Sequence, residues 1–314
     1  MALVLVSSAV VQEKSFSLSS SETLDNINVG IAVGRKRKFE GLATLDLFPL
    51  PNRTTQKFLN AKLQARKLKL ECGSCYIPKE DEEYPRGQDA HFVCSADNVI
   101  GVADGLGGFK KRGIDAGVYA RNLMSHASSM TTARATTLPA CPLRILKKAA
   151  SATRAQGGST ACIIALQGRK IVAANVGDSG FLVVRNGKVA YRSPVQVRGF
   201  NSPLYLHTDS CKWAQVLEVP VEEGDSIVAA TDGLFDNLFE DTILNIISKG
   251  RKYEFNPRTV AQLLARVAHQ MSLQKKHDTP FSKASREAGR LGHQGGKRDD
   301  ITVVVANVIS SAGS

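Results

Sequence analysis

Residues 99–108 read VIGVADGLGG, an apolar run that stops at Asp104 and is followed by Gly105. A short apolar run bounded by turn residues is typical of a buried strand. Residues 226–231 repeat the pattern, because that run is also followed by an Asp-Gly pair, beginning at Asp232. Two strands that each deliver a carboxylate at one end predict a sheet edge where acidic side chains gather.

The surrounding chain predicts antiparallel sheets. Asn186-Gly187 between two apolar runs is the strongest two-residue hairpin signal, and Gln167 to Arg169 separate a second pair of runs. Strands are predicted at 91–94, 99–103, 159–166, 170–176, 181–185, 188–191, 213–219, 225–230 and 300–308, and helices at 113–130, 141–153, 240–248 and 257–273. Because hairpin-connected strands and helices occur in separate blocks, the pattern indicates an α+β fold.

The first predicted helix, 113–130, is expected to pack on a sheet. Its helical spacing turns Val118, Leu123 and Met124 toward a core.

Five isolated aspartates stand at or next to the ends of predicted strands: Asp89, Asp104, Asp178, Asp232 and Asp299. Hard divalent cations bind oxygen ligands such as carboxylates and backbone carbonyls. Two such ions can activate water and stabilise an in-line displacement at phosphorus. A single Asp-Gly pair is more often part of a turn, so the joint pattern, and no one pair, points to a metal centre. The spacing alone does not name the reaction.

Six segments between residues 73 and 308 carry a resemblance to a known family. They are GQDAHF (87–92), VADGLGG (102–108), GSTA (158–161), NVGDSG (175–180), ATDGLFDN (230–237) and KRDDITV (297–303). On these motifs the chain resembles the metal-dependent serine/threonine phosphatases of the protein phosphatase 2C family. It is most similar to the compact organellar branch, and to its plant members.

The resemblance implies a four-layer αββα sandwich, in which two antiparallel sheets are flanked by helices and two Mg²⁺ or Mn²⁺ ions lie between the sheets. A third ion would bind more weakly. A hydroxide that bridges the two ions would attack phosphoserine or phosphothreonine directly. The implied metal ligands are Asp89, Asp104, Asp232 and Asp299, with the backbone carbonyl of Gly105, and with Asp178 and Asp236 for the weaker ion.

The chain departs from the family pattern around these motifs. Leu106 stands where larger relatives carry a histidine proposed as general acid, so no catalytic acid is assigned. Gln88 replaces a common glutamate, and Tyr84 stands in place of a phosphate-binding arginine, for which Lys79 and Arg86 are candidate substitutes. These departures keep an alternative open, a phosphatase-fold regulatory or binding protein with weak catalysis.

The net charge of +12, from 41 Lys and Arg against 29 Asp and Glu, is unevenly distributed. Residues 1–70 contain 11 basic and 5 acidic residues and are rich in serine near their start. A serine-rich, basic, acid-poor leader is typical of an organelle transit peptide. We therefore expect a transit-peptide-like leader and linker over 1–70 and a catalytic domain over 71–314. The lack of an early arginine favours the chloroplast over the mitochondrion.

Most of the remaining basic excess lies in residues 275–298, which hold seven basic and two acidic residues. Surfaces that bind single-stranded nucleic acid interleave basic and aromatic side chains, and Phe281 alone is aromatic here. We therefore expect phosphoprotein substrates and no nucleic-acid partner, with the chain a monomer. No run of 18 apolar residues occurs, so no transmembrane segment is expected.

Overall fold

The computed structural model describes residues 67–132, 139–207, 211–290, 292 and 294–311, all within one compact unit. Most of the expected leader lies outside these residues. The expected boundary after residue 70 falls inside strand β1 (Leu68–Ile77), where Leu70 is buried. The folded body therefore begins before that boundary. In the part of the chain that the structure describes, no helix is long and apolar enough to cross a bilayer.

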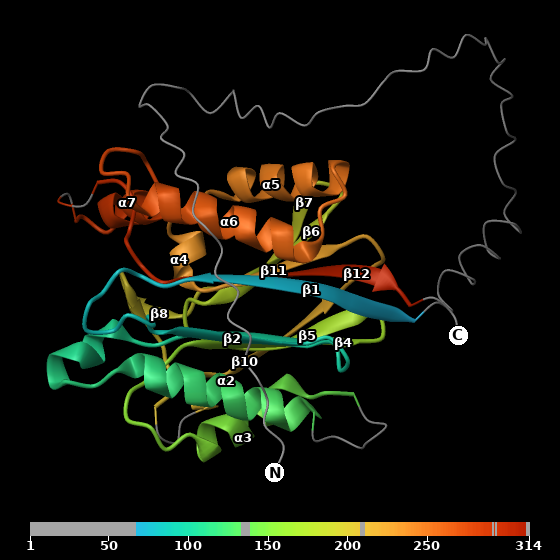
Figure 1. Cartoon of the computed structure of the whole chain (residues 1–314), viewed down its shortest axis with the longest axis horizontal. Coiled ribbons are helices and arrows are strands. Elements are labelled where there is room, and N and C mark those ends of the chain that lie inside the picture. Colours follow the sequence, from blue (N-terminus) through green and yellow to red (C-terminus); the bar gives the residue numbers. More distant parts are fainter. Residues whose placement is uncertain (1–66, 133–138, 208–210, 291, 293, 312–314) are drawn as a thin grey trace, which may run out of the picture. The chain divides into compact units, whose positions relative to one another are not determined.

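Two five-stranded antiparallel sheets form the centre of the molecule (Figure 1). The first sheet contains, in order, β1, β12 (Ile301–Ser310), β11 (Ser226–Ala230), β6 (Gly180–Arg185) and β7 (Lys188–Arg192). The second contains β10 (Gln215–Pro220), β5 (Lys170–Val176), β4 (Ala161–Gln167), β3 (Val99–Asp104) and β2 (Asp89–Cys94). A separate ribbon pairs β8 (Val197–Gly199) with β9 (Ser202–Pro203).

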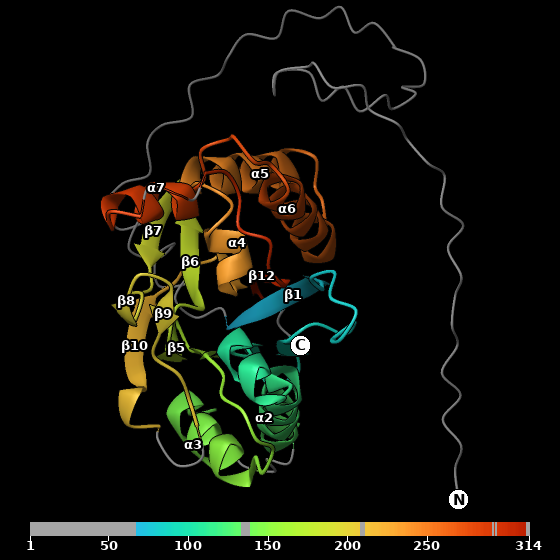
Figure 2. The same ribbon diagram turned by 90° about the vertical axis from the view of Figure 1, so that its left-hand side faces the viewer.

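Helices cover the outer face of each sheet, which gives four layers (Figures 1 and 2). The second sheet carries α2 (Ala116–Thr132) and α3 (Pro142–Ala152), and the first carries α5 (Glu240–Lys252) and α6 (Pro257–Ser272). The remaining short helices are η1 (Gly107–Arg112), η2 (Cys211–Trp213), α4 (Asp232–Phe235) and α7 (Pro280–Glu287). The expected αββα sandwich is confirmed.

Three apolar cores hold the layers together. One lies between the sheets and includes Ile100, Ile164, Ile227 and Val304, while the other two lie between each sheet and its helices. Full burial of one such side chain contributes about 1.5–3 kcal/mol, so the inter-sheet core fixes how the two sheets face each other. The acidic strand ends described below depend on that placement.

The side chains of α2 follow the expected pattern in part. Leu123 and Met124 are buried against the second sheet, as predicted. Val118 is 42% exposed, so its expected place in the core is wrong. The buried face of α2 is formed by Tyr119, Ala120, Leu123, Met124 and Ala127, and the helical spacing directs Val118 to the opposite side.

Local chemistry accounts for the predicted hairpin between β6 and β7 and for the start of α7. Asn186 and Gly187 have φ of 51° and 74°, the left-handed pair that a two-residue hairpin between β6 and β7 requires. The helix α7 lies within 275–298, the basic segment expected to form a flap or a helix with a loop. It begins with a capping box, in which the side chains and backbone N–H groups of Thr279 and Ser282 bond reciprocally.

The register of the hairpin β2–β3 is fixed by close packing. Phe92 lies opposite Gly101, and a Cβ atom on Gly101 would overlap the Phe92 ring. The ring therefore needs a glycine at this position. The same register places Asp89 opposite Asp104 at the end of the hairpin.

Candidate metal centre

Five strand ends deliver the predicted aspartates to the space between the sheets. Asp89 begins β2 and Asp104 ends β3. Because alternate strand residues share a face, both carboxylates follow the side of β2 and β3 that faces the inter-sheet core. Asp178 follows β5 of the same sheet, whereas Asp232 follows β11 and Asp299 precedes β12 of the other sheet.

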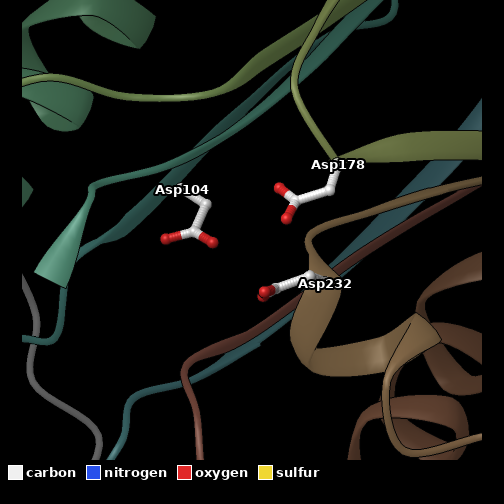
Figure 3. Close-up of side chains that lie close together, drawn as sticks. All are labelled: Asp104, Asp178 and Asp232. Carbon is white, nitrogen blue, oxygen red and sulfur yellow. The ribbon is translucent and has the colours of Figure 1, made fainter. Parts of the chain in front are cut away.

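Three of these carboxylates form a tight group. Asp104, Asp178 and Asp232 each offer an oxygen within 4.8 Å of the others, the spacing of ligands around one cation. Figure 3 shows the three carboxyl groups directed toward a common space from three different segments. The structure thus brings together acids that are 74 and 54 positions apart in the chain.

Asp89 is held by a hydrogen bond that joins the two sheets. Its Oδ2 accepts from the hydroxyl of Thr231 at 2.7 Å, and Thr231 directly precedes Asp232. The hydroxyl oxygen of Thr231 also accepts from the backbone N–H of Thr302 at 3.1 Å. The acidic end of β2 is therefore tied to the acidic end of β11.

The other two predicted ligands gather around a lysine. The Lys297 ammonium contacts Asp232 Oδ2 and lies 2.8 Å from Asp236 Oδ2 and 3.1 Å from Asp299 Oδ2. Asp178 and Asp236 are both predicted to bind a weaker third ion, but their surroundings differ. Asp236 pairs with Lys297, whereas Asp178 lies in the tight group with Asp104 and Asp232. The sequence placed Lys297 in the motif KRDDITV and in a basic segment, without assigning it a role at the metal centre.

Burial makes this collection of acids unfavourable in its charged form. It raises the pKa of the Asp104 carboxyl well above its usual range, and the nearby Asp232 and Asp89 carboxylates raise it further. Burial likewise raises the pKa of Asp178 to about 8, and that of Asp236 to about 7 despite the opposing charge of Lys297. Repelling buried carboxylates are stabilised when cations lie between them.

The free oxygens fit a hard divalent cation. Asp178 Oδ1 and Asp232 Oδ1 are buried and have no hydrogen-bond partner among the described residues. Carboxylate oxygens without a protein partner in a buried site are what Mg²⁺ or Mn²⁺ would use. The donor set therefore suits a metal centre better than a structural hydrogen-bond network.

Glycines after two of the aspartates let backbone segments approach closely. A Cβ atom on Gly105 would lie 2.6 Å from the carbonyl oxygen of Ala116, and one on Gly233 would overlap that of Asp300. The Asp-Gly pairs are thus needed for packing at the centre as well as for turning the chain. The carbonyl of Gly105 remains the predicted backbone ligand.

Asp300 is a second residue that sequence reasoning did not single out. Its Oδ1 accepts from the Tyr76 hydroxyl and from the Lys79 N–H, both at 2.9 Å, and its Oδ2 accepts from the Gln88 N–H at 3.0 Å. Asp300 is 4% exposed. It therefore anchors the segments that flank Asp89 and Asp299. In the sequence, the only sign of this role is that Asp300 directly follows Asp299 in the motif KRDDITV.

A pocket opens onto the acidic group from solvent. Besides Asp104, Asp232 and Asp299, its lining includes Lys79, Gln88, Leu106, Lys297 and Arg298. Of the two candidate substitutes for the phosphate-binding arginine, Lys79 lies at this pocket, with Nζ 3.9 Å from Asp299 Oδ1. Arg86 lines a different pocket, beside His91 and Arg121.

The stability of the metal-free protein is expected to fall with rising pH. The pKa values of about 8 for Asp178 and about 7 for Asp236 exceed the ordinary 3.8, so the folded chain holds protons that the unfolded chain releases. Stability is therefore lost as the pH rises from the ordinary value of 3.8 to the raised values of about 7 and about 8. We expect the Tm in EDTA to drop by about 2–4 °C for each kcal/mol lost.

The check is a series of thermal melts in EDTA between about pH 6 and pH 8.5. Asp178→Asn removes one of the buried carboxyls whose pKa is raised, so it should make the dependence less steep. A Tm that stays constant or rises over this range would contradict the burial of ionisable carboxyls described here.

Comparisons with known proteins show the family to which the chain belongs. A family model described as protein phosphatase 2C matches residues 83–275, more than half of the chain. Probable protein phosphatase 2C 55 of Arabidopsis thaliana is 45% identical over 256 residues, which cover 80% of this chain and 54% of that protein. The chain thus spans about half the length of this curated relative.

Solved structures share the fold. The photosystem II phosphatase PBCP aligns at 32% identity with a TM-score of 0.70, over 76% of this chain and 98% of that chain. The catalytic domain of the serine/threonine protein phosphatase PstP, solved with two manganese ions, aligns at 16% identity with a TM-score of 0.55, over 77% of this chain and 100% of that chain. Two antiparallel sheets with an acidic centre between them define a phosphatase 2C-like protein. This chain belongs to the protein phosphatase 2C family.

Proposed function

We propose that the chain is a metal-dependent protein serine/threonine phosphatase. The observation that carries the proposal is the convergence of buried carboxylates from both sheets, three of them with oxygens within 4.8 Å of one another. Such a group is costly to build without cations. Membership of the family and the 45% identity to a probable phosphatase support the same activity.

The proposed centre binds two Mg²⁺ or Mn²⁺ ions. We infer that the two ions are held by the carboxylates of Asp89, Asp104, Asp232 and Asp299 and by the carbonyl of Gly105. Asp178 and Asp236 would contribute only weakly to metal binding. The two manganese ions in the structure of PstP, which has a similar fold, support this number. Ions bound here would activate water and offset the negative charge of a transferring phosphoryl group.

The residues around the pocket have separate tasks in this proposal. The Lys79 side chain is 44% exposed, so its ammonium can attract a phosphate dianion to the mouth of an otherwise acidic pocket. Arg298 adds a second positive charge at the rim. Leu106 lines the pocket and has no proton to donate. Among the described residues that line the pocket there is no histidine, so no side chain is assigned as general acid.

Hydrolysis of a phosphothreonine peptide by the full chain tests the proposal. Phosphate release should require Mn²⁺ or Mg²⁺ and should stop in EDTA, because the carboxylates alone repel the phosphate. Equal rates in EDTA would contradict the metal mechanism. A chain that binds Mn²⁺ and the peptide but releases no phosphate would instead be a phosphatase-fold binding protein.

We also propose that the leader within residues 1–70 directs the chain to the chloroplast and that the folded body, which begins at β1, acts there as a monomeric catalytic domain on phosphoproteins. The composition of the leader supports this, as does the likeness to a photosystem II phosphatase. A fluorescent reporter fused behind residues 1–70 should enter chloroplasts. Import into mitochondria would decide for the alternative compartment.

A further inference from the structure

A lysine ammonium lies inside the acidic centre. Lys297 Nζ contacts Asp232 and is 2.8 Å from Asp236 and 3.1 Å from Asp299, while its side chain is 14% exposed. Lysine is rarely buried unless it is paired. Here one cation meets three carboxylates, two of which are among the proposed metal ligands.

The backbone of Lys297 is fixed by a side chain from another segment. The Asn237 amide group donates to the carbonyl of Lys297 and its oxygen accepts from the Lys297 N–H, both at 2.9 Å. The same amide group donates to the carbonyl of Gly233 at 2.9 Å. Asn237 is 1% exposed. The lysine therefore starts from a position that the fold determines.

The preceding glycines lead the chain into this position. A Cβ atom on Gly296 would overlap the carbonyl oxygen of Met271, so only glycine lets the segment pass this close to the end of α6. Further along the side chain, the ammonium lies 5.3 Å from the centre of the Phe281 ring. Contacts to both the backbone and the side chain of Lys297 thus place its ammonium next to Asp236.

The ammonium lies where a third divalent ion would need its ligands. Asp178, Asp232 and Asp236 border one pocket, together with Phe281. Without a lysine, their oxygens could serve a further cation beside the two main ions. With the ammonium 2.8 Å from Asp236, a divalent ion at the same carboxylate would face a like charge in a poorly solvated site.

We propose that Lys297 is a built-in cation that takes the place of a third metal ion, so that the centre holds two divalent ions and no more. This rests on the proposed metal-dependent function. The lysine keeps Asp236 neutralised when the two main ions occupy Asp232 and Asp299. It positions and balances the carboxylates and is no catalytic residue.

The number of Mn²⁺ ions bound by the full chain, measured by equilibrium dialysis and native mass spectrometry, tests the proposal. Wild type should bind two ions and Lys297→Met three, whereas Lys297→Arg, which keeps the charge, should again bind two. Arg298→Met is the matched control. It removes the positive charge next to Lys297 in the sequence, but this charge is more exposed than that of Lys297 and pairs with Glu80. It should bind two.

Thermal melts separate this role from a merely structural one. Lys297→Met should lower the Tm strongly in EDTA and only slightly in Mn²⁺, because a third ion then replaces the lost charge. A decrease of equal size under both conditions would overturn the proposal. So would three ions in wild type, or two ions in both wild type and Lys297→Met.

Two further results keep the outcome unambiguous. If Lys297→Met does not fold, the double variant with Asp236→Asn should fold and bind two ions, because it removes both charges of the pair. Failure of the double variant to fold would overturn the role of charge. A wild-type chain that binds no Mn²⁺ would instead refute the proposed function, and with it the basis for this inference.

Discussion

Asp104→Asn is expected to reduce Mn²⁺-dependent hydrolysis of a phosphothreonine peptide by at least about 10²–10³-fold, a typical loss when one preorganised electrostatic group is removed. Asp104 lies opposite Asp89 and shares the tight group with Asp178 and Asp232. Asparagine keeps the shape but loses the charge that holds a cation. Steady-state rates and Mn²⁺ affinity of the purified variant measure the effect.

The same variant should not unfold. Neutralising one of several repelling buried carboxylates relieves strain in the metal-free protein, so the Tm in EDTA should be equal to or higher than that of wild type. Asp241→Asn is the matched control, since Asp241 is exposed in the first turn of α5. Its activity should stay within about twofold. Wild-type activity of the Asp104→Asn variant would show that Asp104 is not a ligand of the metal centre.

Asp300→Asn is expected to lower the free energy of unfolding by about 2–4 kcal/mol, because hydrogen bonds to a charged group contribute about 1.5–3 kcal/mol each. The carboxylate accepts from Tyr76, Lys79 and Gln88. An asparagine amide has one accepting oxygen and one NH₂ group. The NH₂ group would therefore face a donor that now bonds to a carboxylate oxygen of Asp300. Urea unfolding in EDTA measures the loss.

Tyr76→Phe provides the matched control for Asp300→Asn. It removes one donor of the three and leaves the carboxylate, so the expected cost is about 1 kcal/mol. Equal effects of the two substitutions would show that the buried carboxylate is not the anchor of this network. In activity assays Asp300→Asn should also be the weaker enzyme, because Lys79 and Gln88 line the pocket.

The strands that carry the aspartates could be predicted because their signals are local. Apolar runs that stop at Asp104 and Asp232, and the Asn186-Gly187 turn, need no knowledge of the rest of the chain. Strand β1 could not be predicted in this way. Charged residues and Gly73 interrupt its apolar pattern, and it is a strand because β12 pairs with all ten of its residues.

The roles of Lys297 and Asp300 depend on contacts between distant segments. Lys297 meets Asn237 and Asp232 across 60 and 65 positions, and Asp300 meets Gln88 across 212. Residue type and spacing do not report such contacts. In the sequence Lys297 is one of several basic residues, and its contribution becomes visible only when α4 and the segment before β12 lie side by side.

The packing of Phe92 on Gly101 has a consequence for the chemistry at the far end of that hairpin. β2 is an edge strand, so β3 alone sets its alignment within the sheet. Sliding β2 by one residue would turn Asp89 from the inter-sheet space toward α2, since neighbouring strand residues face opposite ways. A phenylalanine ring packed on the bare backbone of Gly101 thus determines whether the acidic centre has its full set of ligands.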